Sequence, residues 1–135
     1  MRGSIVRRAA AAFFGLYAGI TFMLTHYPQL AIPVPGRPDL VAHMGLFGLW
    51  TILCWSCGWF GPVLSEINTW RSLGVSLVYA AVDEASQMVP QIRRVAALDD
   101  FGANALGVMA AGALILAVTG LARRGEAGII RPRGG

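Results

Sequence analysis

Four long apolar stretches dominate this chain, and charged or proline-containing segments separate them. They cover approximately residues 9–25, 40–60, 70–89 and 100–122. A helix needs roughly 20 mainly apolar residues to cross a hydrocarbon core about 30 Å thick. Proline removes an amide donor and ends helices, so Pro28, Pro62 and Pro90 mark boundaries with a physical cause. We therefore predict an all-α integral membrane protein, a bundle of four transmembrane helices.

The composition agrees with lipid as the solvent. Among 135 residues, 56% are hydrophobic and only 13% are charged, too few charges for a water-soluble domain of this size. The formal charge of +4 comes from arginine alone, since the chain has no lysine. These arginines lie at the ends of the apolar stretches rather than in one stripe, so we expect no nucleic-acid partner.

The arginine distribution also predicts the orientation, because cytoplasmic segments of membrane proteins are enriched in basic residues. Eight arginines belong to the N-terminus, the segment after the second stretch and the C-terminal tail, and three belong to the opposite side. Both termini are therefore predicted to be cytoplasmic, in a multi-pass protein of the bacterial inner membrane. The predicted parts are a basic N-terminus (1–8), a membrane domain (9–122) and a basic tail (123–135).

Polar and ionisable residues interrupt the apolar stretches toward one predicted depth in the outer half of the bilayer. An ionisable side chain costs on the order of 2.5–3.5 kcal/mol within a membrane and therefore needs a partner or a wet cavity. The second stretch carries Asp39 and His43 one helical turn apart, and the third carries Asp83, Glu84 and Gln87. Asp100 and Asn104 follow on the fourth, after Asp99, and Arg93 and Arg94 lie in the preceding connection. We predict that these residues converge.

Each of these residues also has a purely structural interpretation. Asp39 and the first of Asp99 and Asp100 could be helix N-caps. His43 could bond a backbone carbonyl, and Glu84 could form an ion pair with one of the two arginines. His26 is interpreted as an interfacial residue at the end of the first stretch. Cys54 and Cys57 form a Cys-x-x-Cys without the βαβ context of a redox pair, and we interpret them as small buried residues.

Taken together, these positions resemble the VanZ-like membrane proteins, whose pattern is D-K-x-x-H-F, then E-x-x-Q, a proline–arginine loop and D-x-x-x-N-x-x-G. The matching residues run from Asp39 to about Gly112. Leu40 replaces the lysine of the pattern and Met44 the phenylalanine, and the loop is one residue longer, so that either Arg93 or Arg94 fills the basic position. The resemblance implies a compact helical membrane domain, and the founding member is associated with resistance to the lipoglycopeptide teicoplanin.

Three functions are compatible with the predicted cluster. The first is a binding module whose extracytoplasmic polar cavity recognises an envelope lipid or a lipoglycopeptide-type amphiphile, with Asp39, Gln87, Arg93, Arg94, Asp100 and Asn104 as contacts. The second is a membrane-embedded enzyme that acts on a lipid-linked envelope substrate, with His43 and Glu84 as acid and base. The third is a structural or oligomerising subunit, in which the cluster locks the bundle together or supports an oligomer. Separately, Gly15 and Gly19 form a Gly-x-x-x-Gly face that would allow close approach of another helix. The sequence identifies no cofactor and shows no Cys/His metal-ligand spacing.

Overall fold

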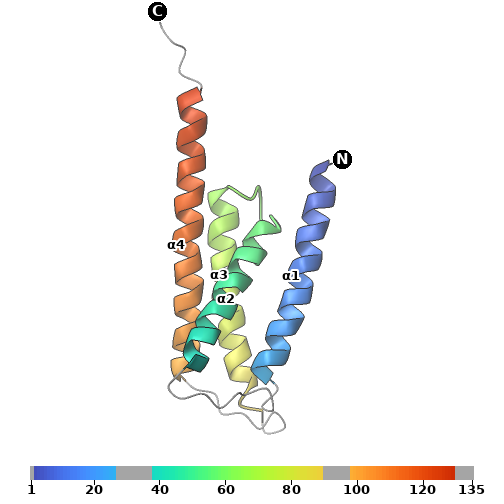
Figure 1. Ribbon diagram of the computed structural model, residues 1–135, viewed down its shortest axis with the longest axis vertical. Helices are drawn as coiled ribbons and strands as arrows, with labels where there is room; N and C mark the ends of the chain where they lie inside the picture. The colour runs from blue at the N-terminus through green and yellow to red at the C-terminus, as the bar shows by residue number, and fades with distance from the viewer. Residues whose placement is uncertain (1, 27–37, 90–97, 130–135) are drawn as a thin grey trace, which may run out of the picture.

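The computed structural model describes residues 2–26, 38–89 and 98–129, and this part of the chain folds into four α-helices without a strand. They are α1 (Arg2–His26), α2 (Pro38–Ser56), α3 (Glu66–Ser86) and α4 (Leu98–Ile129). Successive helices run in opposite directions, with α2 and α3 between α1 and α4 (Figure 1). Helix α1 therefore begins at the same end of the molecule at which α4 ends. The predicted all-helical fold is confirmed for the described residues.

Three of these helices are long and apolar enough to cross a membrane. The qualifying segments are Ile5–His26, Asp39–Ser56 and Leu98–Gly125. Helix α3 is comparably long at 21 residues but contains more polar residues. Eight of its residues are buried, and six of these are polar: Asn68, Thr69, Ser72, Ser76, Asp83 and Glu84. Helix α3 is therefore the helix in which the apolar pattern is weakest, and its polar side chains lie inside the molecule.

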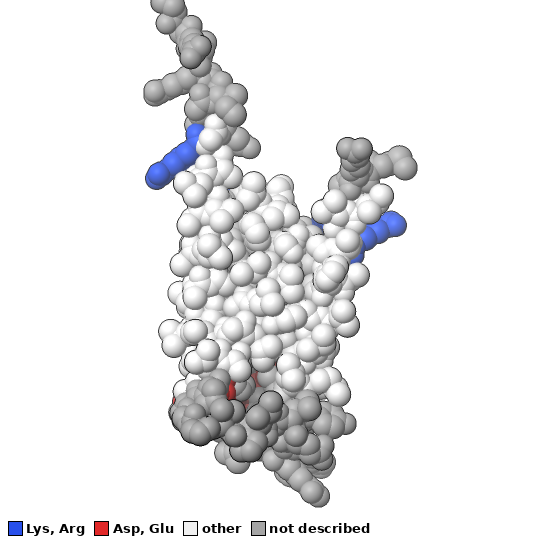
Figure 2. All heavy atoms as spheres, viewed as in Figure 1, with Lys and Arg blue, Asp and Glu red and all other residues white. Residues whose placement is uncertain are grey.

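The outer surface of the four helices is apolar along most of their length. Large hydrophobic side chains are exposed on each helix, including Phe13 on α1, Val41 on α2, Val78 on α3 and Leu106 on α4. Figure 2 shows an uncharged belt, with arginine side chains at the end where the chain begins and the fourth helix ends. Exposed apolar patches of this extent are unusual in soluble monomers. This surface suits contact with lipid.

Local sequence explains the sharp connection between α2 and α3. Helix α2 ends at Ser56, and Gly58 follows with φ of +60°, a left-handed conformation that glycine adopts without steric cost. Ser65 is the N-cap of α3, and its side chain accepts a hydrogen bond from the Asn68 amide at 3.3 Å. Asn68 in turn donates to the carbonyl of Trp55 at 2.9 Å. The buried asparagine thus ties the start of α3 to the end of α2.

Helices α2 and α4 pack with their backbones in close contact. A Cβ atom on Gly107 would lie 2.1 Å from the Met44 carbonyl oxygen, and one on Gly48 would lie 3.2 Å from the Gly107 carbonyl oxygen. Only glycine fits at residue 107, because the obstructing atom belongs to the backbone. By contrast, a Cβ on Gly15 or Gly19 would meet no atom within 4 Å. Those two glycines face outward in a shallow groove of α1.

Two apolar clusters fill the interior between the helices. One contains Phe14, Trp50, Cys54 and Cys57, and the other contains Phe47, Leu73, Ala80 and Val108. Trp50 stacks on Tyr79 with ring centroids 4.7 Å apart and meets Phe14 edge-on at 4.8 Å. Both cysteines are free and fully buried. The aromatic contacts connect α1, α2 and α3, and the cysteines occupy the space that a small apolar residue would fill.

Candidate functional site

Buried and half-buried polar side chains from all four helices lie near the end of the molecule where α1 and α3 end and α2 and α4 begin. We call this group the polar end cluster. Its members are Thr25, His26, His43, Asp83, Glu84, Ser86, Gln87, Asp100 and Asn104. The antiparallel arrangement explains the convergence, because it brings residues near 26, 43, 84 and 104 to one level. Printed side-chain contacts join α2 to α4 and α1 to α3 at this level, and α1 contributes Thr25 and His26.

His43 joins α2 to α4 within the cluster. Its Nδ1 atom lies 3.0 Å from Asn104 Oδ1, and its Nε2 atom lies 3.9 Å from Asp100 Oδ2. His43 is 7% exposed and Asn104 is fully buried. Because Asn104 presents its carbonyl oxygen to the ring, Nδ1 is the donor in this contact. Gly107 lies less than one turn beyond Asn104, so the close contact of α4 with Met44 places the amide beside the histidine.

Asp83 is the centre of a second set of contacts, between α1 and α3. Thr25 donates its hydroxyl to Asp83 Oδ1 at 3.0 Å, and Gln87 donates its side-chain amide to Asp83 Oδ2 at 3.4 Å. Asp83 is 2% exposed, and His26 Nδ1 lies 3.8 Å from its Oδ1 atom. Hydrogen bonds to both carboxylate oxygens offset the cost of burying this group.

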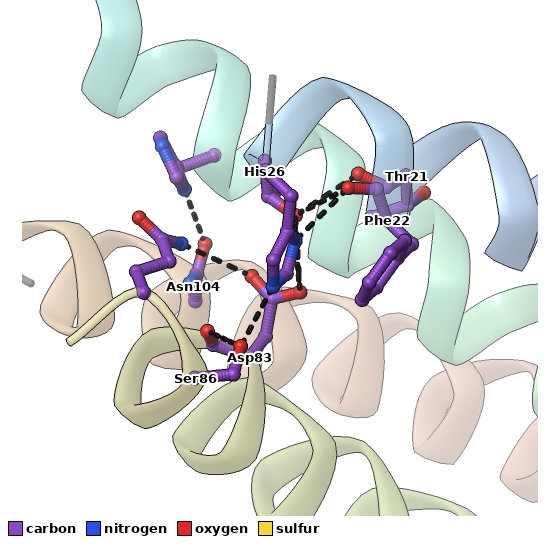
Figure 3. Close-up of polar contacts among 9 residues, drawn as sticks. Thr21, Phe22, His26, Asp83, Ser86 and Asn104 are labelled. Atoms are coloured by element: carbon purple, nitrogen blue, oxygen red, sulfur yellow. Dashed lines mark hydrogen bonds and ion pairs between the residues drawn. The ribbon is translucent and has the colours of Figure 1, made fainter. Parts of the chain in front are cut away.

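His26 lies inside the structure, at the junction between α1 and α3 (Figure 3). Its Nε2 atom lies 2.7 Å from the Ser86 hydroxyl, and Nδ1 lies 3.0 Å from the Phe22 carbonyl oxygen. The ring also stacks on Phe22, with centroids 3.9 Å apart. His26 is 9% exposed, so the residue interpreted as interfacial at the end of the first stretch contacts α3 in the interior of the bundle. In the sequence, the signal for this contact is the pair of adjacent polar residues, Thr25 and His26, at the end of the first apolar stretch.

Two amide groups in the cluster keep unused hydrogen-bonding atoms. Asn104 Nδ2 and Gln87 Oε1 have no hydrogen-bond partner among the described residues, although both side chains are at least 99% buried. A buried polar atom without a partner costs about 1–3 kcal/mol. One is a donor and the other an acceptor, the combination that a hydroxyl group or a water molecule satisfies. Within the described residues, the cluster thus retains one free donor and one free acceptor.

The remaining predicted residues are of three kinds: members of the cluster, exposed residues, and residues outside the described part of the chain. Glu84 is buried on α3 at 7% exposure, next to Asp83. Asp39 is exposed in the first turn of α2. Asp99 is exposed in the first turn of α4, and its Oδ1 atom accepts a hydrogen bond from the Asp100 backbone amide at 3.2 Å. Asp100, rather than Asp99, thus lies beside His43. Arg93 and Arg94 fall outside the described residues.

The chemistry available to the cluster is hydrogen bonding and proton exchange. Three carboxylates, two imidazoles and two amides meet there, and Ser86 supplies a half-buried hydroxyl. Within residues 2–26, 38–89 and 98–129, no group of three or more His, Cys, Asp and Glu side chains is arranged to hold a metal ion. The described side chains therefore suit recognition of hydroxyl, amide or cationic groups.

Comparison with known proteins gives no relative from which a role could be transferred. No protein-family model, no curated protein and no solved structure matches the chain.

Proposed function

We propose that this chain is a VanZ-like, multi-pass protein of the bacterial inner membrane whose polar end cluster binds the headgroup of an envelope lipid or of a lipoglycopeptide-type amphiphile. The observation that carries the proposal is the burial of polar side chains from four helices at one end of a bundle with an apolar outer surface. An amphiphile in the bilayer would approach from the apolar side and present its polar group to the cluster. The unused atoms of Asn104 and Gln87 would then receive partners.

Four membrane spans, with α3 as the third, are part of this proposal. At 1.5 Å per residue, the 21 residues of α3 extend about 31 Å, which matches the hydrocarbon thickness. Its polar side chains face the bundle, whereas Val75, Val78 and Val82 are exposed to the outside. A polar inward face and an apolar outward face are what a membrane-spanning helix in a bundle requires. The arginine distribution supports cytoplasmic termini and an extracytoplasmic cluster.

An enzyme that acts on a lipid-linked envelope substrate is the second candidate. The contact of His43 with Asn104 supports it, because that contact fixes the ring through Nδ1 and directs Nε2 toward Asp100. A histidine oriented through one nitrogen is the usual arrangement for proton transfer at the other. Glu84, buried on the neighbouring helix, would be the second acid–base group.

The binding proposal is tested with the purified protein in lipid nanodiscs and teicoplanin as the probe. We expect His43→Asn and Glu84→Gln each to weaken teicoplanin binding by roughly tenfold, the effect of losing one hydrogen bond to a charged or strongly polar group. Thr119→Val is the matched control, because Thr119 is a buried residue on α4 whose hydroxyl has no partner among the described residues. It lies about 22 Å along α4 from Asn104, outside the cluster.

The same variants separate the three functions. Normal yield of folded protein with unchanged teicoplanin binding and unchanged host susceptibility would reject the binding proposal. Turnover of a lipid-linked envelope substrate by the wild type, lost in Glu84→Gln while binding persists, would favour the enzyme. A loss of folded protein in both variants, with Thr119→Val unaffected, would support the structural role instead.

A further inference from the structure

The opposite end of the molecule contains a groove between the start of α1 and the connection from α2 to α3. It has a volume of about 340 Å³ and is lined by Arg7, Gly58, Trp59, Gly61, Pro62 and Val63. None of these residues is acidic. The groove therefore combines one cation with apolar and backbone surface.

The Arg7 side chain is held in position by the backbone of the connection. Its Nη2 atom donates to the Gly58 carbonyl oxygen at 2.8 Å. The left-handed conformation of Gly58, with φ of +60°, belongs to the turn that presents this carbonyl. A guanidinium carries five N–H donors, so this bond orients the group and leaves others for a ligand. No described carboxylate forms an ion pair with Arg7.

Arg123, at the same end of the molecule, differs from Arg7 because it forms an ion pair. Its guanidinium pairs with the Glu66 carboxylate, so its charge is already compensated. Arg7 has no such compensation within the described residues and borders a groove. Among the arginines described at this end, Arg7 is the one that lines the groove.

Trp59 supplies the apolar side of the groove. It is 50% exposed and packs edge-on against Phe14, with ring centroids 5.1 Å apart. Leu64, which follows the groove residue Val63, is also exposed. Tryptophan is favoured where hydrocarbon meets headgroups. An arginine and a half-exposed tryptophan at one groove match a ligand with a phosphate and acyl chains.

We propose that this groove binds the phosphate of an anionic phospholipid headgroup, with Arg7 contacting the phosphate and Trp59 flanking the acyl chains. The site goes beyond the proposed function and depends only on the membrane location within it. A headgroup with a net negative charge is favoured, because it neutralises the positive charge of Arg7. A zwitterionic headgroup carries a cation of its own, which Arg7 repels. Free phosphate offers the same anion without the apolar contacts.

The experiment measures retained lipid by native mass spectrometry of the full chain released from nanodiscs of dioleoyl-phosphatidylglycerol and dioleoyl-phosphatidylcholine in equal amounts. We expect the wild type to retain phosphatidylglycerol preferentially and Arg7→Gln to lower its apparent affinity by roughly tenfold, the loss of one charge-assisted contact. Arg123→Gln is the matched control and should retain the lipid as the wild type does. Arg7→Lys keeps the charge without the planar fork and should give an intermediate value.

Several outcomes would overturn the proposal. Equal loss in Arg7→Gln and Arg123→Gln would mean attraction to the whole basic end rather than a site. Unchanged retention in Arg7→Gln, with helical content preserved by circular dichroism, would remove Arg7 from lipid binding. Saturable, Arg7-dependent binding of sodium phosphate as strong as that of the lipid would overturn the lipid assignment. The comparison of Arg7→Gln with its parent is repeated in the His43→Asn background, where the effect of Arg7 should persist, so that failure at the groove is distinct from failure at the polar end cluster.

Discussion

At the scale of single residues, the contacts of His26 distinguish a structural link from a surface residue. Its ring bridges two helices that are far apart in sequence, through Ser86 Oγ on α3 and the Phe22 carbonyl on its own helix. Thr25, one residue earlier, reaches Asp83. Two consecutive side chains of α1 thus bind α3, and in a low-dielectric surrounding such hydrogen bonds are strong and costly to leave unmade.

A double-mutant cycle tests this link. We expect His26→Ala and Ser86→Ala each to destabilise the fold and to show a coupling energy of about 0.5–1.5 kcal/mol, the usual net value of one hydrogen bond. The measurement is the unfolding free energy in detergent. The control cycle pairs His26→Ala with Ser76→Ala, because the Ser76 hydroxyl bonds only the Ser72 carbonyl within α3. Additive effects in the first cycle would mean that the His26–Ser86 contact contributes nothing to stability.

At the scale of the helices, the crossing of α2 and α4 positions the polar end cluster. Gly107 allows the α4 backbone to approach the Met44 carbonyl, and Asn104 then lies within 3.0 Å of His43. Asp100, Asn104 and Gly107 recur at helical spacing on one face of α4. The glycine of the sequence pattern is therefore explained by packing, and the two polar residues by what that packing brings into contact.

Gly107→Ala tests the importance of this crossing. A Cβ at 2.1 Å from a backbone oxygen must push the helices apart, so we expect a loss of about 1–3 kcal/mol in the free energy of unfolding. The variant should also weaken teicoplanin binding, because it separates Asn104 from His43. Gly102→Ala is the control on the same helix, since its Cβ would meet no atom within 4 Å. That change should be neutral or stabilising by up to about 1 kcal/mol, through helix propensity. Equal effects of the two substitutions would contradict the packing argument.

At the scale of the whole molecule, polar side chains are concentrated in the interior and apolar side chains on the surface, unlike in a water-soluble protein. Polar side chains such as Asp83, Gln87 and Asn104 are buried, while large hydrophobic side chains cover the outside. The charged side chains visible in Figure 2 gather at the ends of the bundle. This distribution suits a bilayer, and it predicts which segments face each side of it.

The topology is tested by labelling single introduced cysteines in cells with a membrane-impermeant maleimide. We expect Arg93→Cys to react from outside, and Arg71→Cys and Arg124→Cys to react only after permeabilisation. The native Cys54 and Cys57 are fully buried, so the wild type should give little background. Reaction of Arg71→Cys and Arg93→Cys from the same side would mean that α3 does not cross. Reaction of Arg93→Cys from the cytoplasm alone would reverse the orientation.

Much of the helix content could be predicted from the sequence, because it depends on local properties. Runs of apolar residues bounded by proline and charge predict helices of membrane-spanning length, and the four described helices correspond to the four predicted stretches. The sequence also indicated that His43, Glu84 and Asn104 would lie at one level, because an antiparallel bundle with segments of known length determines depth. The weak apolar character of α3 was visible as well, in its polar residues near Asp83.

Only the tertiary structure decided which side chains meet. Whether Asp99 or Asp100 faces His43, and whether His26 points inward, depends on the rotation of each helix about its axis. That rotation is determined by contacts between residues far apart in sequence, such as Gly107 with Met44 and Thr25 with Asp83. The sequence by itself thus determined the helices and the level of the polar residues, because hydropathy and helix geometry are local. Their partners required the packed structure, because interhelical contacts are not local.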